Sequence, residues 1–258
     1  MKTNITILSL LLAILLCIPV TSYSLPLIDI EAAIGGQYQS FQGDIANNGE
    51  SIDIENDLKY DDKMFLTARA KIGLPLFIPN VYVIALPMKF DGEGLKNINF
   101  QFGDTNFTGG ESFYSELNIN VYDVALFYEL PLIKLATLGI IKIEAGLNAR
   151  IMEADAKIDQ VEFFSELSES KKITAAFPML YLYAKVHPIE MFAVEAEARG
   201  VSYSGNSMYS LIGRVKLKFF GPIFAAGGLR YETIDIDRDD FKMKTSFIGP
   251  FIEAGFEF

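Results

Sequence analysis

The stretch Phe247-Ile-Gly-Pro-Phe-Ile-Glu-Ala-Gly-Phe-Glu-Phe258 alternates between two kinds of side chain. One face of an extended strand would carry an apolar series, namely Ile248, Pro250, Ile252, Ala254, Phe256 and Phe258. The other face would carry Glu253 and Glu257 among small residues. This period of two predicts a β-strand. A strand that ends in water frays, whereas the closing strand of a barrel pairs with the first strand and has no free edge. The stretch therefore predicts a β-barrel whose last strand ends on aromatic residues.

The start of the chain has the pattern of an export signal. A positively charged beginning precedes an apolar run at residues 7–20, and small residues precede a cleavage site after Ser24. The apolar run is too short to span a bilayer comfortably. We therefore expect residues 1–24 to be a signal peptide and residues 25–258 to form the barrel.

Composition narrows the class of protein further. The 258 residues are 50% hydrophobic, with a mean hydropathy of +0.25 and a formal net charge of −11. That charge argues against nucleic acid as a partner. After residue 24 no apolar run approaches the ~20 residues of a helical span, so a membrane would be crossed by strands. Cys17, the only cysteine, lies in the export signal without the small residue that precedes a lipoprotein cysteine. We expect no lipid anchor, disulfide or thiol chemistry.

A short proline cue divides the rest of the chain into hairpins. Proline lacks an N–H and fixes φ, which suits a turn or the first residue of a strand. The cue occurs five times, at Leu25-Pro-Leu27, Leu74-Pro-Leu76, Leu130-Pro-Leu132, His187-Pro-Ile189 and Gly221-Pro-Ile223. Each cue is followed by two alternating segments with a polar stretch between them. Five hairpins predict ten antiparallel strands, with eight strands as the alternative.

The alternating segments give each strand one apolar face, which we expect to face lipid. The clearest is 140–151, where a series of Ile, Ala and Leu opposes Lys142, Glu144, Asn148 and Arg150. In 81–90, the series from Tyr82 to Phe90 is expected to face outward and Lys89 inward. The segment 114–130 changes phase near Tyr122-Asp123, which predicts a bulge. Three prolines fall in mid-strand and also predict local bulges; they are Pro87, Pro178 and Pro250.

Alternation by itself fits a soluble β-sandwich as well as a membrane barrel. The export signal, the terminal Phe and the uneven connections favour the barrel. The segments 40–62, 94–113 and 159–171 predict long external loops, and the proline cues predict short periplasmic turns. Tyrosines near the strand ends predict interfacial girdles; they are Tyr38, Tyr82, Tyr128, Tyr209 and Tyr231.

If the apolar faces point outward, the charged faces line the interior. The expected interior network comprises Arg69, Lys71, Lys142, Glu144, Arg150, Glu195, Glu197, Arg199, Arg214, Lys216, Lys218, Arg230, Glu232 and Glu253. Acids and bases nearly balance there, so the negative excess belongs to loops such as 40–62. Buried charges persist only when they are paired and hydrogen-bonded. We therefore expect a plugged, salt-bridged core, with a thin ion or solute path past inward glycines as the alternative.

Few residues suggest catalysis or metal binding. His187 is the only histidine, and it lies in a proline turn expected to face the periplasm. Barrel enzymes of the outer membrane mostly use a histidine near the outer face, so we expect an exposed turn residue instead. The acidic run 235–240 matches no spaced Ca²⁺ loop and is expected to be a solvated hairpin tip. We expect no metal and no cofactor.

The segments Leu25-Pro-Leu-Ile-Asp-Ile-Glu-Ala32, Ile52-Asp-Ile-Glu-Asn-Asp-Leu58 and Pro79-Asn80 together resemble an uncharacterised family of Gram-negative outer-membrane β-barrel proteins. The terminal pattern with Phe256 and Phe258 is similar to the assembly signal of such barrels. The resemblance implies an outer-membrane location and brings no activity with it. The partners expected are outer-membrane lipid, lipopolysaccharide and, through the last strand, the barrel-assembly machinery.

Fold-level resemblance does not give function. The leading hypothesis is a non-enzymatic barrel with acidic surface loops and a plugged interior, in a structural or surface role. A narrow channel for ions or small solutes is the second hypothesis, and a membrane-embedded enzyme is the third. The sequence does not identify a ligand.

Overall fold

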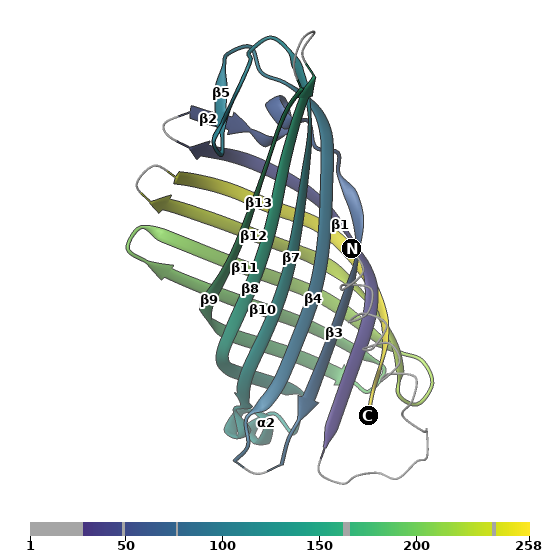
Figure 1. The fold of residues 1–258 in the computed structure, drawn as a ribbon. Coiled ribbons are helices and arrows are strands. Elements are labelled where there is room, and N and C mark those ends of the chain that lie inside the picture. The colour runs from purple at the N-terminus through teal and green to yellow at the C-terminus, as the bar shows by residue number, and fades with distance from the viewer. Residues whose placement is uncertain (1–27, 48–49, 76, 162–165, 239–240) are drawn as a thin grey trace.

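The chain forms a closed antiparallel β-barrel (Figure 1). The structure, a computed structural model, describes residues 28–47, 50–75, 77–161, 166–238 and 241–258. The signal peptide expected at residues 1–24 lies outside the described residues. Ten strands build the wall, each hydrogen-bonded to the next, and the last strand pairs with the first. This confirms the antiparallel barrel and settles the strand number at ten.

The wall strands are β1 Asp29–Asn47, β3 Lys63–Gly73, β4 Asn80–Leu95, β7 Ser112–Glu129, β8 Ile141–Val161, β9 Glu166–Ile189, β10 Phe192–Tyr203, β11 Asn206–Lys218, β12 Ile223–Arg238 and β13 Phe241–Glu257. Five shorter elements lie in the connections, namely β2 Glu50–Asp53, the π-helix η1 Ile54–Leu58, β5 Phe100–Phe102, β6 Thr105–Phe107 and α2 Pro131–Ala136. We call the end with β2, β5 and η1 the loop end, and the end with α2 the turn end (Figure 1).

The outer surface carries an apolar belt that follows from the strand alternation. In β4, β7, β8 and β9 the register aligns Val81, Leu126, Leu147 and Leu180 in one row. Leu126 and Leu147 are exposed, as are their counterparts on the other strands, including Ile34, Leu211, Leu229 and Ile252. Exposed side chains of this kind on a closed barrel are typical of a wall that faces lipid.

The interior was predicted wrongly at β4. Tyr82, Ile84, Leu86 and Phe90 point inward and are buried, whereas Lys89 points outward. The neighbouring strand β7 likewise turns apolar residues inward, from Phe113 to Phe127. Within the belt both faces of these strands are largely apolar, so the alternation alone did not show which face is inside. Tyr82 therefore does not belong to an interfacial girdle.

No bulge interrupts β7, contrary to the sequence prediction. Its pairing with β4 and with β8 runs without a register shift through Tyr122 and Asp123. The change of phase in the sequence has another cause. The inner face of β7 is apolar toward the loop end and carries Asp123 and Glu129 toward the turn end. The residue types on this face therefore change along the strand, while the strand geometry stays regular.

Each of the three prolines has a register partner on one neighbouring strand and lies where pairing with the other neighbour is missing, without a bulge. The pairing of β3 with β4 ends at Ala68–Ala85, just short of Pro87. The pairing of β10 with β9 ends at Gly200–Leu180, just short of Pro178. At Pro250 the register of β13 with β1 is unchanged on either side, but the intervening pairs are absent. A residue without an N–H is tolerated where no ladder bond is required of it.

Four strands continue past the belt and form a protruding sheet at the loop end. They are β4, β7, β8 and β9, the long strands that rise toward the top of Figure 1. Their outward face becomes polar in register, in a row formed by Lys89, Asn118, Asp155 and Lys172. The expected loop at 159–171 is therefore mostly strand, because β8 extends to Val161 and β9 begins at Glu166.

The expected loop at 40–62 also has defined structure. It consists of the end of β1, the short strand β2 and η1, whose Ile54 and Leu58 are buried. Asp53 caps η1, with its carboxylate accepting from the N–H groups of Glu55 and Asn56. Burial raises the pKa of the neighbouring Tyr60 to about 12. The segment thus folds into the mouth of the barrel, and only part of its acidic surface is external.

The turn end has short connections, as predicted. Pro131 begins α2, a single short helix between β7 and β8 that buries none of its residues. Among the described residues there is no helix long and apolar enough to cross a membrane.

Candidate functional site

The candidate site is the charged interior of the barrel in its turn-end half. All fourteen residues of the network expected from sequence take part in ion pairs there. Twelve of them are buried or nearly so, while Lys142 and Lys218 lie closer to the opening at the turn end, with side chains 28% and 32% exposed. Further inward charges join the network, namely Glu31, Asp123, Glu129, Lys185 and Glu257.

The innermost layer is centred on Arg150 of β8. Its guanidinium lies 2.7 Å from Asp123 of the adjacent strand and 2.9 Å from Glu232 of β12, across the barrel. Glu232 also binds Arg230 at 2.9 Å. Asn148 donates to Asp123 and accepts from Arg199. A planar guanidinium with several donors suits this bridging position, because it can bind two carboxylates at once.

A second layer joins β1, β3, β10, β11 and β13. Arg69 binds Glu31 and Glu253, at 2.5 and 2.7 Å. Lys216 binds Glu31 and Glu195, both at 2.8 Å. The register places Glu195 directly opposite Arg214, whose guanidinium lies 3.2 Å from it. Residues two apart on one strand share a face, so the spacing of charges along β10 and β11 brings these groups together.

Lys71 has an aromatic environment that the sequence prediction missed. Its ammonium group lies 3.7 Å from the ring centre of Tyr183, 4.8 Å from that of Phe127 and 5.4 Å from that of Tyr82. Glu144 binds the same ammonium at 2.6 Å. Cation–π contacts and one carboxylate thus replace water around this charge. In β9 the inward tyrosines alternate with the outward Leu180 and Leu182. This alternation in the sequence could have predicted that the tyrosines face the interior.

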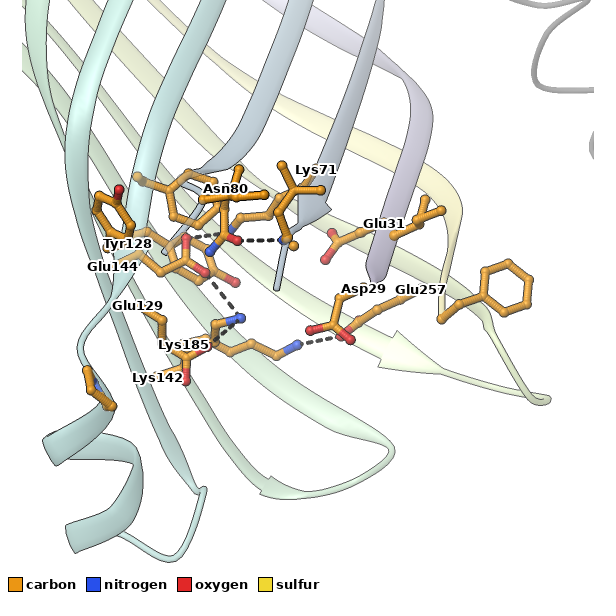
Figure 2. A pocket seen from close by; sticks show the side chains of 18 of the residues that line it. Asp29, Glu31, Lys71, Asn80, Tyr128, Glu129, Lys142, Glu144, Lys185 and Glu257 are labelled. Carbon is orange, nitrogen blue, oxygen red and sulfur yellow. Dashed lines mark hydrogen bonds and ion pairs between the residues drawn. The ribbon is translucent and has the colours of Figure 1, made fainter. Parts of the chain in front are cut away.

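At the turn end the network opens to solvent in a vestibule (Figure 2). This cavity of about 570 Å³ is lined by acids and lysines from both sides of the barrel, among them Asp29, Glu129, Lys142, Lys185 and Glu257. Lys142 bridges Glu129 and Glu144, and Lys185 binds Glu257 at 3.0 Å. Opposite charges thus neutralise one another along most of the wall.

Toward the loop end the interior is closed by an apolar core. Phe41, Phe90 and Phe247 stack together, with ring centres 4.3 to 6.2 Å apart. Side chains from the other strands and from η1 complete this core, and Phe90, Leu86 and Ile54 are fully buried. The inward glycines do not open a path. A Cβ on Gly146 would stand 2.1 Å from the carbonyl oxygen of Leu126, so this glycine permits a close approach of two strands.

Of the residues considered for other chemistry, His187 lies at the turn-end rim of this interior and the acidic run at 235–238 lies apart from it. His187 belongs to strand β9, with its N–H donating to Ile140, and it lines a smaller cavity at the turn end with Lys218. Asp235 and Asp237 lie in β12 near the loop end, where Asp237 binds Lys242. Within the described part of the chain no cluster of His, Cys, Asp or Glu is arranged to hold a metal ion.

Comparison with known proteins supports the fold class. No family model matches the sequence, and no curated protein matches it significantly. Among solved structures, the outer membrane protease OmpT from Escherichia coli is similar over 93% of this chain and 99% of its own, with a TM-score of 0.55 and 9% identity. The translocator domain of autotransporter NalP from Neisseria meningitidis matches over 90% and 88%, with a TM-score of 0.43 and 12% identity. Neisserial surface protein A matches over 90% and 97%, with a TM-score of 0.30 and 10% identity.

At such low identity the likeness to OmpT concerns architecture alone. The chain has the fold of outer-membrane β-barrels. The proteins it resembles differ in role, so they do not assign it an activity.

Proposed function

We propose that this chain is a non-enzymatic, integral protein of a Gram-negative outer membrane, with a closed interior and a surface role. The observation that carries the proposal is the continuous filling of the barrel. Paired charges occupy the turn-end half, and an apolar core with Phe90 and Leu86 fully buried occupies the loop-end half. Such an interior resembles a packed core more than a pore. Function then belongs to the surfaces that the barrel presents.

The proposed orientation places the loop end outside the cell and the turn end in the periplasm. Long connections at one end and short ones at the other are typical of outer-membrane barrels. The apolar belt would contact lipid, and the polar face of the protruding sheet would lie beside or beyond the lipopolysaccharide headgroups. We place cleavage of the export signal after Ser24.

We propose the terminal residues as the contact with the barrel-assembly machinery. Phe258 is 61% exposed on the outer wall, and its ring lies against that of Phe256. The N–H of Phe258 donates to Ile30 at 2.9 Å, next to the start of β1. The terminal aromatics therefore lie at the closing seam.

Two measurements test this proposal. Single-channel recording of the purified protein in planar bilayers should show no steady conductance; a stable conductance would establish the channel, the second hypothesis, for which the vestibule is the supporting feature. Because residues 25–258 lack cysteine, single cysteines can report orientation. Ser204→Cys, at the loop-end tip between β10 and β11, should react with an impermeant maleimide on intact cells, and Glu190→Cys, at the turn end, should not. The reverse labelling would overturn the orientation.

A further inference from the structure

The protruding sheet has one edge without a partner strand. Strand β9 pairs with β8 from Glu166 to Val186, but its pairing with β10 ends at Leu180. Among the strands that the structure describes, none pairs with the second edge of β9 at residues 167–179. Backbone N–H and C=O groups of such an edge form a ready template for another strand.

The opposite edge of the protruding sheet is covered, which makes the two edges unequal. Strand β4 loses its pairing with β3 beyond Ala85, but η1 packs against it there. The carbonyl oxygen of Leu58 lies 2.5 Å from where a Cβ on Gly92 would stand, so only glycine admits this approach. Lys63 and Asp91 form an ion pair across the same gap. The described residues therefore close one edge, and beyond the contact of β6 with β9 at Glu169 they leave the other edge open.

The faces beside the open edge indicate what would bind. On the inner face of β9, Ile173 is 52% exposed although it points toward the apolar core, and Phe177 is half-buried. Across the gap, Val201 of β10 packs against that core and is also half-buried. On the outer face, Lys172 and Thr174 are exposed and polar. Along residues 172–179 an added strand would thus meet an apolar surface inside and a polar one outside, because the charged residues of the inner face, Glu169 and Lys171, lie closer to the start of β9.

We propose that residues 171–179 of β9 bind an extended peptide of a partner protein as an additional strand; this proposal rests on the proposed surface role. Its residues would alternate, apolar toward Ile173 and polar toward solvent. Main-chain hydrogen bonds would give affinity, and alternate side chains would give selectivity.

A second copy in the same membrane fits the edge poorly. Two copies that share one orientation are related by an axis along the membrane normal. Such an axis places identical edges face to face at equal height, so that N–H groups face N–H groups. A parallel ladder needs N–H opposite C=O. An extended peptide can instead choose its direction and register.

The test uses the full exported chain in detergent micelles and amide hydrogen exchange resolved by residue. Phage-displayed peptides of about twelve residues, alternating apolar and polar, are selected on the folded protein. In the free protein, alternate amides of 171–179 should exchange rapidly, because they lack an acceptor. A selected peptide should slow them about tenfold or more and leave amides at the β10–β11 tip unchanged. Amides already protected in the free protein, protection that rises with protein concentration, or no slowing by any peptide would overturn the proposal.

Two insertion variants test whether the selected peptide binds at the open edge of β9. Adding about eight β-forming residues between Ser204 and Gly205 would lengthen β10 and β11 enough to cover the edge. This variant should lose peptide binding about tenfold, whereas a Gly/Ser insertion of equal length should retain it. Equal binding by both would place the peptide elsewhere and overturn the proposal. The experiment is independent of cell-surface labelling, so failure of the orientation and failure of the docking edge are distinguishable.

Discussion

Glu197 shows how tightly each buried charge depends on its neighbours. Its carboxylate is paired with Arg199 on its own strand, and it accepts a hydrogen bond from Tyr82 on the other side of the barrel. Arg214 lies 3.5 Å from the same carboxylate. Removing one charge from such a set leaves the others desolvated without a partner, and this costs more than the net value of the pair.

We therefore expect Glu197→Ala or Arg214→Ala to lower the free energy of unfolding by about 3–5 kcal/mol in micelles, measured by urea titration. The matched control is Lys172→Ala. Lys172 pairs with Asp155 at 2.9 Å, but its side chain is 80% exposed, and the expected change is about 0–1 kcal/mol. Equal, small changes at all three positions would mean that water fills the interior, which favours the channel.

The cap of η1 gives a pH prediction at residue scale. Hydrogen bonds from the Asn56 side chain and backbone lower the pKa of Asp53 below its ordinary value of 3.8. A carboxyl whose folded pKa is lowered stabilises the fold above the ordinary value, and this contribution is lost as pH falls through the lowered value. The amide signals of Glu55 and Asn56 should therefore change only below about pH 4 by NMR. An Asp53→Asn variant should show no such change, and a wild-type transition near neutral pH would contradict the cap.

At the scale of the element, β13 joins the end of the chain to its beginning. Its last residues pair with β1 from Glu257 opposite Glu31 onward, and Phe258 adds two backbone hydrogen bonds with Ile30. Both the side chain and the backbone of Phe258 thus contribute to closure of the barrel.

Deleting Phe258 should lower the amount of folded protein in the outer membrane, measured by quantitative blotting of membrane fractions at equal expression. Phe258→Ala keeps the backbone pairing and should lower the yield less if closure dominates, or equally if the ring is the assembly signal. The control is Phe219→Ala, which also removes an exposed aromatic ring, 53% exposed, near a turn. Unchanged yield after deletion would show that the last residue serves neither role.

At the scale of the whole molecule, ten strands that each pair with both neighbours form one cooperative unit. Closed barrels of this kind keep their backbone groups satisfied internally and resist partial unfolding. The unheated protein should therefore migrate faster than the boiled protein on a denaturing gel, because the folded barrel stays compact. The variant Arg214→Ala should convert at a lower temperature than Lys172→Ala. Identical migration before and after boiling would contradict the barrel fold itself.

Alternation along the chain predicted β-strands and the outward face of most of them, and the export signal, the terminal Phe and the proline cues favoured a barrel of ten strands over one of eight. Alternation also determined the residues that form the charged interior, because charges on a lipid-facing wall are costly. Strands such as β8, with Ile143 and Leu147 on one face and Glu144 and Arg150 on the other, allow only one orientation. Local sequence is sufficient there because the two faces differ chemically.

Only the tertiary structure decided the interior of β4 and β7, the protruding sheet and the partner of each charge. Both faces of β4 are largely apolar, so alternation could not choose between lipid and core for Tyr82 or Phe90. The pairing of Arg150 with Glu232 joins β8 to β12 across the barrel. No local sequence pattern predicts that these two residues come into contact. The register of neighbouring strands also decides where pairing stops, at Leu180 on β9. Strand register depends on two segments together. The local sequence of β9 therefore does not show that its edge is open.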